Sequence, residues 1–194
     1  WRQQGILQAA LSKLLNALHE HGVIDLSESY IDGSFAPAKR GGDLVGKTKK
    51  GKGTKIMAIA ARRGLPISCS IASASPHEVT LVENCIESCW LACTPEIVIG
   101  DKAYDSDALD DRLASRGIKL IAPHKINRRK AKTQDGRSLR RYKRRWKVER
   151  LFAWLQNYRR IVTRYEQFAS NFQAMINLAC LMIILSRYLK IVAE

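Results

Sequence analysis

The sequence predicts an α/β fold, in which a mixed sheet of three antiparallel strands and then parallel strands carries helices on both faces. The first observation is a hairpin pattern, because two apolar runs rich in β-formers, at 54–61 and 65–73, are separated by a short turn. The second is that strand-like segments at 96–104 and 118–123 alternate with helical segments, as they do in parallel sheets. With 194 residues, of which 46% are hydrophobic, the chain is long enough for one globular domain.

Local patterns place the other elements. Residues 5–22 repeat apolar side chains at helical spacing and stop at Gly22. Residues 27–35 have the pattern of a strand that runs into a turn at Gly33, and a Gly- and Lys-rich loop follows at 38–53. This loop and the basic connection at 124–138 are expected to be the mobile parts. Further helices are expected at 77–93, 107–117, within 140–160 and at 166–191.

The positive charge of the chain is concentrated in two segments. The formal net charge is +15, yet residues 122–164 carry 16 Lys and Arg against two acids, and residues 39–63 carry nine against one. These segments amount to +14 and +8, which leaves −7 for the rest of the chain. A basic surface beside an acidic remainder is typical of a protein that binds nucleic acid; the alternative is a charge pattern that only keeps the protein soluble.

The five cysteines show no paired short spacing. Cys85, Cys89 and Cys93 lie four residues apart, on one face of the helix expected at 77–93. Zinc could use that spacing, but the apolar neighbours favour core packing of free cysteines, and this favours a reducing, cytoplasmic setting. The longest apolar run, residues 178–185, is much shorter than the roughly 20 residues that span a bilayer. It is expected to be a buried helix, and no membrane is expected as a partner.

Two aspartates stand where predicted strands end. Asp32 follows the strand in "YIDGSF", and Asp101 follows the strand in "VIGD". Functional residues of open α/β sheets collect beyond the carboxyl ends of strands, so the two carboxylates meet if these strands are adjacent and parallel. Neither is placed as a plain helix cap; the alternative is that each is a turn-forming residue beside a glycine. Divalent cations such as Mg²⁺ take oxygen ligands of this kind, and a site that cuts phosphodiesters can use two such ions.

A third carboxylate stands alone in a basic stretch. Glu149 is the single acid among nine Lys and Arg in residues 140–160. At about 100° per residue, Tyr142, Arg145, Glu149 and Gln156 share one stripe of the expected helix, beside an apolar stripe that can pack on the sheet. Glu149 could therefore point toward the strand ends and complete a metal site, or it could be a salt-bridge partner within the helix.

Three motifs together, "YIDGSF", "IGDKAYDS" and "YKRRWKVERLFAWL", resemble the DDE transposases of bacterial insertion sequences, particularly the four/five group of insertion-sequence families. That group shows Tyr, two residues, Arg, three residues, Glu, six residues and Lys. Tyr142, Arg145 and Glu149 stand at this spacing, but Gln156 occupies the position of the Lys. The resemblance spans roughly residues 27–170.

The resemblance implies an RNase H-like fold and an enzyme that cleaves DNA at transposon ends and transfers the strand to target DNA. Asp32, Asp101 and Glu149 would be the catalytic, metal-binding triad and would hold two Mg²⁺ ions, with Mn²⁺ as a substitute. The implied partners are double-stranded DNA, as transposon ends and target, and a second copy of the chain in a homodimer on that DNA. The implied location is the bacterial cytoplasm, on the nucleoid when DNA is bound. Two rival hypotheses are a non-catalytic DNA-binding remnant of a transposase and an RNase H-like metal-dependent nuclease.

Several basic residues are expected to bind the DNA. Arg145 would hold a phosphate near the cut, and Arg159 or Arg160 would supply the charge that Gln156 lacks. Trp146 and Trp154 could stack on a flipped base, or they could pack in the core. The expected DNA-binding residues are Arg145, Tyr142, Lys102, Lys143, Arg144, Arg159, Arg160 and Gln156.

Other polar residues have two interpretations. His77 or Glu78 could line the site, or Glu78 could complement the dipole at a helix start. Asp105 is expected to cap the helix that follows it, and Glu166 is expected to be a helix-start charge.

The chain is expected to have three parts. These are an N-terminal helix that leads in at 1–26, an RNase H-like DDE catalytic domain at 27–165, and a C-terminal apolar helix at 166–194 that packs on the same domain. Because the first residue is Trp and not Met, the sequence is expected to be N-terminally incomplete.

Overall fold

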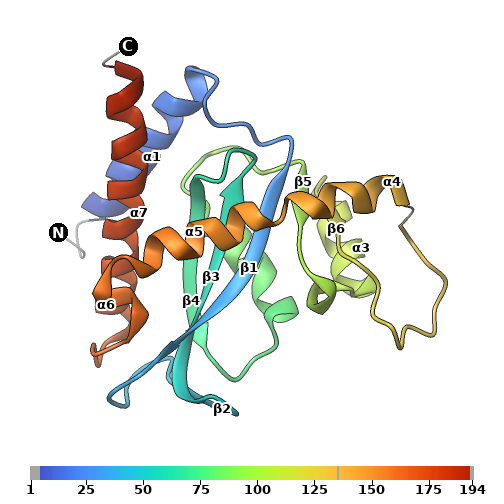
Figure 1. The fold of residues 1–194 in the computed structure, drawn as a ribbon, viewed down its shortest axis with the longest axis horizontal. Helices are drawn as coiled ribbons and strands as arrows, with labels where there is room; N and C mark the ends of the chain where they lie inside the picture. Colours follow the sequence, from blue (N-terminus) through green and yellow to red (C-terminus); the bar gives the residue numbers. More distant parts are fainter. Residues whose placement is uncertain (1–4, 135, 193–194) are drawn as a thin grey trace.

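The computed structural model describes residues 5–134 and 136–192, which form a six-stranded mixed sheet with helices on both faces (Figure 1). The central strand β1, Ser29–Pro37, pairs antiparallel with β3, Gly51–Ala61, and parallel with β5, Ile97–Ile99. Beyond these, β4, Pro66–Ser73, pairs antiparallel with β3, and β6, Lys119–Ile121, pairs parallel with β5. The predicted succession of antiparallel and then parallel strands is confirmed.

Helices cover the two faces of this sheet. α5, Trp146–Gln156, crosses β1 and β3 in the front of Figure 1, and α2, Val82–Glu87, packs on β3 and β4. α3, Asp107–Ser115, packs on β6. At the β4 end of the sheet, α1, Ile6–Glu20, and α7, Ala169–Val192, lie side by side.

Helical periodicity decides which side chains these helices bury. In α1, the buried residues are Leu11, Leu15 and Leu18, which share one face of the helix. In α5, a buried stripe that includes Val148 and Leu155 packs on the sheet. Residues at the edge of that stripe are therefore held close to the strands without being buried in the core.

β1 is longer than the sequence predicted. The expected turn at Gly33 is wrong, because β3 pairs with β1 over its whole length, from Ser29 opposite Ala61 to Pro37 opposite Gly53. Asp32 thus lies within the strand and does not end it. Part of the expected loop at 38–53 is also regular, because β2, Gly46–Thr48, forms a hairpin with the start of β3.

The helix expected at 77–93 ends early. A 3-10 helix at Glu78–Leu81 leads into α2, which stops at Glu87, so that Cys89 and Cys93 lie beyond the helix. The backbone N–H of Trp90 instead donates to the carbonyl of Ile67 in β4, which draws the chain onto the sheet edge. Cys85 is buried as predicted, but Cys93 is exposed, so the prediction of a shared cysteine face is wrong.

The basic helix expected within 140–160 is divided. A short α4, Gly136–Leu139, and a 3-10 helix, Arg140–Arg144, precede α5, and α6, Arg159–Val162, follows it. Tyr142 therefore does not belong to the same α-helix as Glu149, as the expected four-residue stripe required. Arg145, directly before α5, still lies one turn ahead of Glu149.

α7 is an apolar helix that packs on the rest of the protein. By length and composition alone, Ala169–Lys190 could cross a membrane, with a mean hydropathy of 1.5. This is weak evidence, because the core helix of a soluble protein meets the same criteria, and α7 packs on α1 and β4. Phe172 and Ile176 are buried, as the prediction of a buried helix required, whereas Met182 is exposed.

Candidate active site

The two predicted aspartates hold equivalent places on neighbouring parallel strands. The pairing between β1 and β5 covers only two positions and ends where Tyr30 lies opposite Ile99. Asp32 and Asp101 each stand two residues after this last pair. Because the strands are parallel, the register brings both residues to one edge of the sheet, where β5 has ended and β1 continues.

Asp32 is partly buried at this edge. One carboxylate oxygen, Oδ1, accepts a hydrogen bond from the backbone N–H of Gly33 at 2.9 Å, and the other, Oδ2, lies 2.8 Å from Nη1 of Arg145. Burial raises the pKa of the Asp32 carboxyl, and the nearby Arg145 guanidinium only partly opposes that rise. Asp32 is therefore a desolvated carboxylate whose nearest positive charge comes from Arg145.

Arg145 bridges two of the three predicted acids. Its Nη2 donates to Oε1 of Glu149 at 2.8 Å, which is the same separation as that between Nη1 and Asp32. Nη1 is buried and, despite the short distance to Asp32, makes no hydrogen bond of good geometry within the described part of the chain. The guanidinium also lies over the Tyr142 ring, 5.9 Å from its centroid. Glu149 is therefore linked to Asp32 through Arg145, which forms an ion pair with each of them.

Asp101 has a local structural role as well. Its side chain accepts a hydrogen bond from the backbone N–H of Ala103 at 2.7 Å and so caps the 3-10 helix Lys102–Tyr104. The expectation that Asp101 is no helix cap is therefore wrong. The cap accounts for one of its oxygens, and the other is not engaged by any contact that the structure records in the described residues.

A fourth carboxylate, Glu78, belongs to the same site. Its Oε2 accepts a hydrogen bond from the buried Tyr104 hydroxyl at 2.9 Å, and its Oε1 lies 3.8 Å from Nζ of Lys55. It lies so close over Gly33 that a Cβ atom there would come within 2.7 Å of its Cδ. Its position is compatible with both open interpretations, since Glu78 also begins a 3-10 helix. In the sequence, the glycine directly after Asp32 was the indication that another side chain approaches the backbone closely there.

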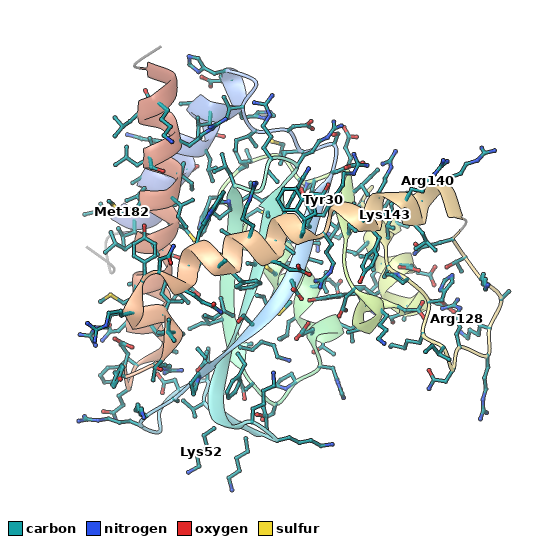
Figure 2. The ribbon with its side chains drawn as sticks, in the orientation of Figure 1. Tyr30, Lys52, Arg128, Arg140, Lys143 and Met182 are labelled. Atoms are coloured by element: carbon teal, nitrogen blue, oxygen red, sulfur yellow. The ribbon has the colours of Figure 1, made fainter. Side chains whose placement is uncertain are left out.

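The other predicted residues are distributed along the basic segment. Lys102 and Lys143 are exposed, the latter on the stretch before α5 (Figure 2). Arg144 is paired with the buried Glu28 at 2.9 Å. Gln156 and Arg159 are exposed at the opposite end of α5 from Arg145. Arg160 pairs with Glu166 at 3.2 Å, and Glu166 precedes α7 by three residues.

The expectation that Asp105 caps the helix after it is wrong, because the N-cap of α3 is Ser106. The Asp105 carboxylate instead pairs with His124 and Arg128 at 2.9 and 2.8 Å, and so anchors the basic connection after β6. Trp154 is partly buried and packs against the core, as one of the two interpretations expected, whereas Trp146 is 49% exposed. Both indoles lie beside the Arg150 guanidinium.

The donor chemistry of this edge fits a divalent cation, but the acids are not assembled around one centre. Within residues 5–134 and 136–192, no three His, Cys, Asp or Glu side chains are grouped closely enough to hold a metal ion. Carboxylate oxygens are the ligands that Mg²⁺ prefers, and Asp32 and Asp101 stand at equivalent positions after the last pair of neighbouring strands. Between Asp32 and Glu149, however, the Arg145 guanidinium occupies the cationic position.

Sequence comparisons relate this chain to known transposases. A family model described as "Transposase DDE domain" matches residues 16–184. The putative transposase for insertion sequence element IS402 of Burkholderia cepacia is 29% identical over 139 residues, which cover 68% of this chain and 62% of that protein. The chain thus spans about three fifths of the length of this curated relative.

One solved structure shows a similar fold at low sequence identity. The piggyBac transposase in a synaptic complex with hairpin DNA superposes with a TM-score of 0.59 at 14% identity, over 87% of this chain and 48% of that one. The catalytic core domain of BIV integrase superposes less well, with a TM-score of 0.39 at 14% identity over 79% of this chain and 80% of that one. The predicted RNase H-like class is confirmed by the fold. The match to the family model covers most of the chain, and the protein therefore belongs to the transposases with a DDE domain.

Proposed function

We propose that this chain is the catalytic domain of an insertion-sequence transposase, which cleaves DNA at transposon ends and transfers the freed strand to target DNA. The observation that carries the proposal is the equal offset of Asp32 and Asp101 from the last β1–β5 pair. A protein that bound DNA only through charge would gain nothing from two carboxylates there, because they repel phosphate.

The catalytic residues in this proposal are Asp32, Asp101 and Glu149, which would hold divalent metal ions, proposed to be two Mg²⁺ with Mn²⁺ as a substitute. When bound, such ions activate an attacking oxygen and stabilise a leaving oxygen in phosphodiester chemistry. In cleavage, a water oxygen forms the new bond to phosphorus, and the departing 3′-oxygen takes a proton and becomes a hydroxyl. In strand transfer, the oxygen of that hydroxyl would form a bond to the phosphorus of a target phosphodiester and lose its proton. The target's own bond from phosphorus to its 3′-oxygen would break, and that oxygen would take a proton, so that one phosphodiester is exchanged for another.

The residues of the chain itself would hold and position these groups. Asp32 is fixed by the N–H of Gly33 and Asp101 by the N–H of Ala103, so each keeps its orientation without a metal. Arg145 neutralises Asp32 and Glu149 while no metal is bound, and it must leave that position before both acids can take part in a metal site. Once released, its guanidinium would be free to bind a phosphate of the DNA.

The exposed Lys102 and Lys143 are proposed to contact DNA, together with Tyr142 beside Arg145. Gln156 and Arg159, which are exposed at the far end of α5 from Arg145, are proposed to contact DNA further along. Arg144 and Arg160 are included only if DNA displaces their partners Glu28 and Glu166. The proposed partners are transposon-end and target DNA, with the protein acting as a homodimer on them in the bacterial cytoplasm.

The test is a strand-transfer assay with a supplied 3′-hydroxyl end and Mg²⁺. Asp32→Asn, Asp101→Asn and Glu149→Gln should each abolish cleavage and joining, whereas DNA affinity stays the same or rises because less negative charge faces phosphate. Asp111→Asn is the matched control, since this exposed acid on α3 undergoes the same chemical change. Joining that survives in Asp32→Asn and Asp101→Asn would refute the triad.

The same assay separates the rival functions. A metal-dependent nuclease would cleave but not join the supplied end, and a non-catalytic remnant would do neither. The remnant has one observation in its favour, because the exposed Gln156 stands where the resembling group has a Lys.

A further inference from the structure

A basic hollow lies between α5, α7 and the turn that joins β3 to β4. Its volume is about 640 Å³, and the cations that line it are Arg62, Arg63, Lys147, Arg150 and Arg187. The one acid in its lining, Asp25, is already paired with Arg62 at 2.9 Å and accepts a hydrogen bond from Ser27. The lining therefore carries a large excess of positive charge that the protein does not neutralise.

Carbonyl groups and aromatic rings, rather than carboxylates, hold Lys147 and Arg150 in place. Lys147 donates to the Arg62 carbonyl, and its ammonium lies 5.2 Å from the centroid of Tyr30, which is labelled beside α5 in Figure 2. Arg150 donates from Nη2 to the Arg63 carbonyl at 2.9 Å. Such contacts orient a cation without cancelling its charge.

Arg150 is pre-oriented with spare hydrogen-bonding capacity. Its guanidinium lies 4.8 Å from the ring centroids of both Trp146 and Trp154, one turn before and one turn after it on α5. Its Nε is buried and has no hydrogen-bond partner in the described part of the structure. A buried donor without a partner destabilises the protein unless water or a ligand satisfies it.

We infer that the basic hollow binds the phosphate backbone of DNA, at a place separate from the acidic edge; this rests on the proposed action on DNA. Five cations over an open hollow of this size suit a chain of phosphates better than one small anion. Duplex DNA presents about one negative charge per 1.7 Å of axis.

The position of the hollow agrees with a single DNA molecule that contacts both places. α5 crosses β1, with Arg145 at the Asp32 end of the crossing and Lys147 at the Tyr30 end. Successive helical residues are about 100° apart, so Lys147 and Glu149 project to nearly opposite sides of α5. The hollow and the acids are thus about one helix diameter apart, roughly 10–12 Å, or about three base-pair steps of 3.4 Å.

The test uses two arginines of the hollow whose side chains have no hydrogen bond or ion pair among residues 5–134 and 136–192. Arg63 and Arg187 are both exposed, so Arg63→Gln with Arg187→Gln removes two charges without breaking a contact. The control pair is Lys13→Gln with Lys119→Gln, which removes two charges from exposed sites on α1 and β6. DNA affinity is measured against salt concentration, with a metal chelator present.

The variant that combines Arg63→Gln with Arg187→Gln is called the hollow pair. It should reduce the slope of log K against log salt concentration, where K is the DNA association constant, by about 1.8, at about 0.9 per lost phosphate contact. The control pair should leave the slope unchanged. A slope that is unchanged in the hollow pair, or equally reduced in both pairs, would overturn the inference. Saturable binding of polyglutamate that the hollow pair abolishes, with the DNA slope unchanged, would overturn it in favour of an acidic protein partner.

This design keeps the two proposals apart. If the unsubstituted protein does not bind DNA at all, the proposed function fails together with the inference. If the protein binds and joins DNA but the hollow pair behaves like the control pair, only the assignment of the hollow fails. Thermal unfolding of both pairs should match the unsubstituted protein, because all four side chains are exposed.

Discussion

Replacing Arg145 by Gln removes one charge from between two carboxylates and tests how the candidate site is held together. The two nitrogen–oxygen distances are equal at 2.8 Å, so distance alone predicts equal interactions with Asp32 and Glu149. Burial predicts otherwise, because the side chains of Arg145 and Asp32 are 16% and 18% exposed, whereas that of Glu149 is 56% exposed. The two halves of one guanidinium thus serve as internal controls for each other.

The expected magnitudes follow from this difference. Breaking a fully buried ion pair costs about 3–5 kcal/mol, while exposed pairs one helical turn apart contribute about 0.3–0.5 kcal/mol. The Arg145–Asp32 pair is not fully buried and its hydrogen-bond geometry is poor, so its coupling should be about 2–3 kcal/mol. The Arg145–Glu149 coupling should stay near 0.5 kcal/mol. At about 2–4 °C per kcal/mol for a chain of this size, Arg145→Gln should lower Tm by roughly 5–10 °C.

Two double-mutant cycles measure these couplings by urea unfolding with a metal chelator present. One combines Arg145→Gln with Asp32→Asn, and the other combines it with Glu149→Gln. Arg159→Gln on α6 is the matched control, because this arginine is exposed. It should change the free energy of unfolding by less than about 0.5 kcal/mol.

Equal couplings in the two cycles, or a larger coupling with Glu149, would refute this reasoning. Either result would mean that burial does not strengthen the contact with Asp32 and that Arg145 is an ordinary helix-surface partner. Arg145→Gln also tests whether Arg145 competes with a metal ion for the carboxylates. Because no guanidinium would have to leave, Mn²⁺ should bind Arg145→Gln more tightly than the unsubstituted protein in calorimetric titration.

Three further predictions concern Glu78, Asp110 and Gln156. Glu78→Ala leaves the buried Tyr104 hydroxyl without an acceptor and should destabilise the protein by about 1–3 kcal/mol; Glu78→Gln keeps an acceptor oxygen, and a loss as large as that of Ala in urea unfolding would contradict the assignment. The pKa of Asp110 is raised from 3.8 to about 6 by burial and by Asp107, so its ionisation destabilises the fold as pH rises between these values. Asp110→Asn should therefore stabilise the protein at pH 8 by at most about 3 kcal/mol, from about 2.2 pKa units at 1.36 kcal/mol each. The gain in the free energy of unfolding should vanish below pH 4, and a gain independent of pH would show another cause. Gln156→Lys should steepen the salt dependence of DNA binding by about 0.9, and an unchanged slope would place this residue away from DNA.

The order of the elements followed from the sequence alone, because it depends on local periodicity. The hairpin of β3 and β4, the leucine stripe of α1 and the alternation of β5, α3 and β6 each express a pattern within a few neighbouring residues. The aspartates were singled out for the same kind of reason, since each stands beside a glycine where an apolar run ends. The localisation of positive charge also needed no tertiary information.

Only the tertiary structure decided which residues meet. β1 passes Gly33 because β3 supplies partners as far as Pro37, a contact that no local pattern contains. α2 stops at Glu87 because the backbone of Trp90 is hydrogen-bonded to β4.

The chemistry of the site depended on the same long-range packing. Glu78 belongs to it because Gly33 leaves room for its carboxylate, and Arg145 became a bridge because α5 crosses β1 at Asp32. The basic hollow likewise joins residues from the turn after β3, from α5 and from α7, and Arg63 and Arg187 in its lining are 124 positions apart. Local propensity determines which element forms, but contacts between distant segments determine what surrounds each side chain, and those surroundings set its charge and its chemistry.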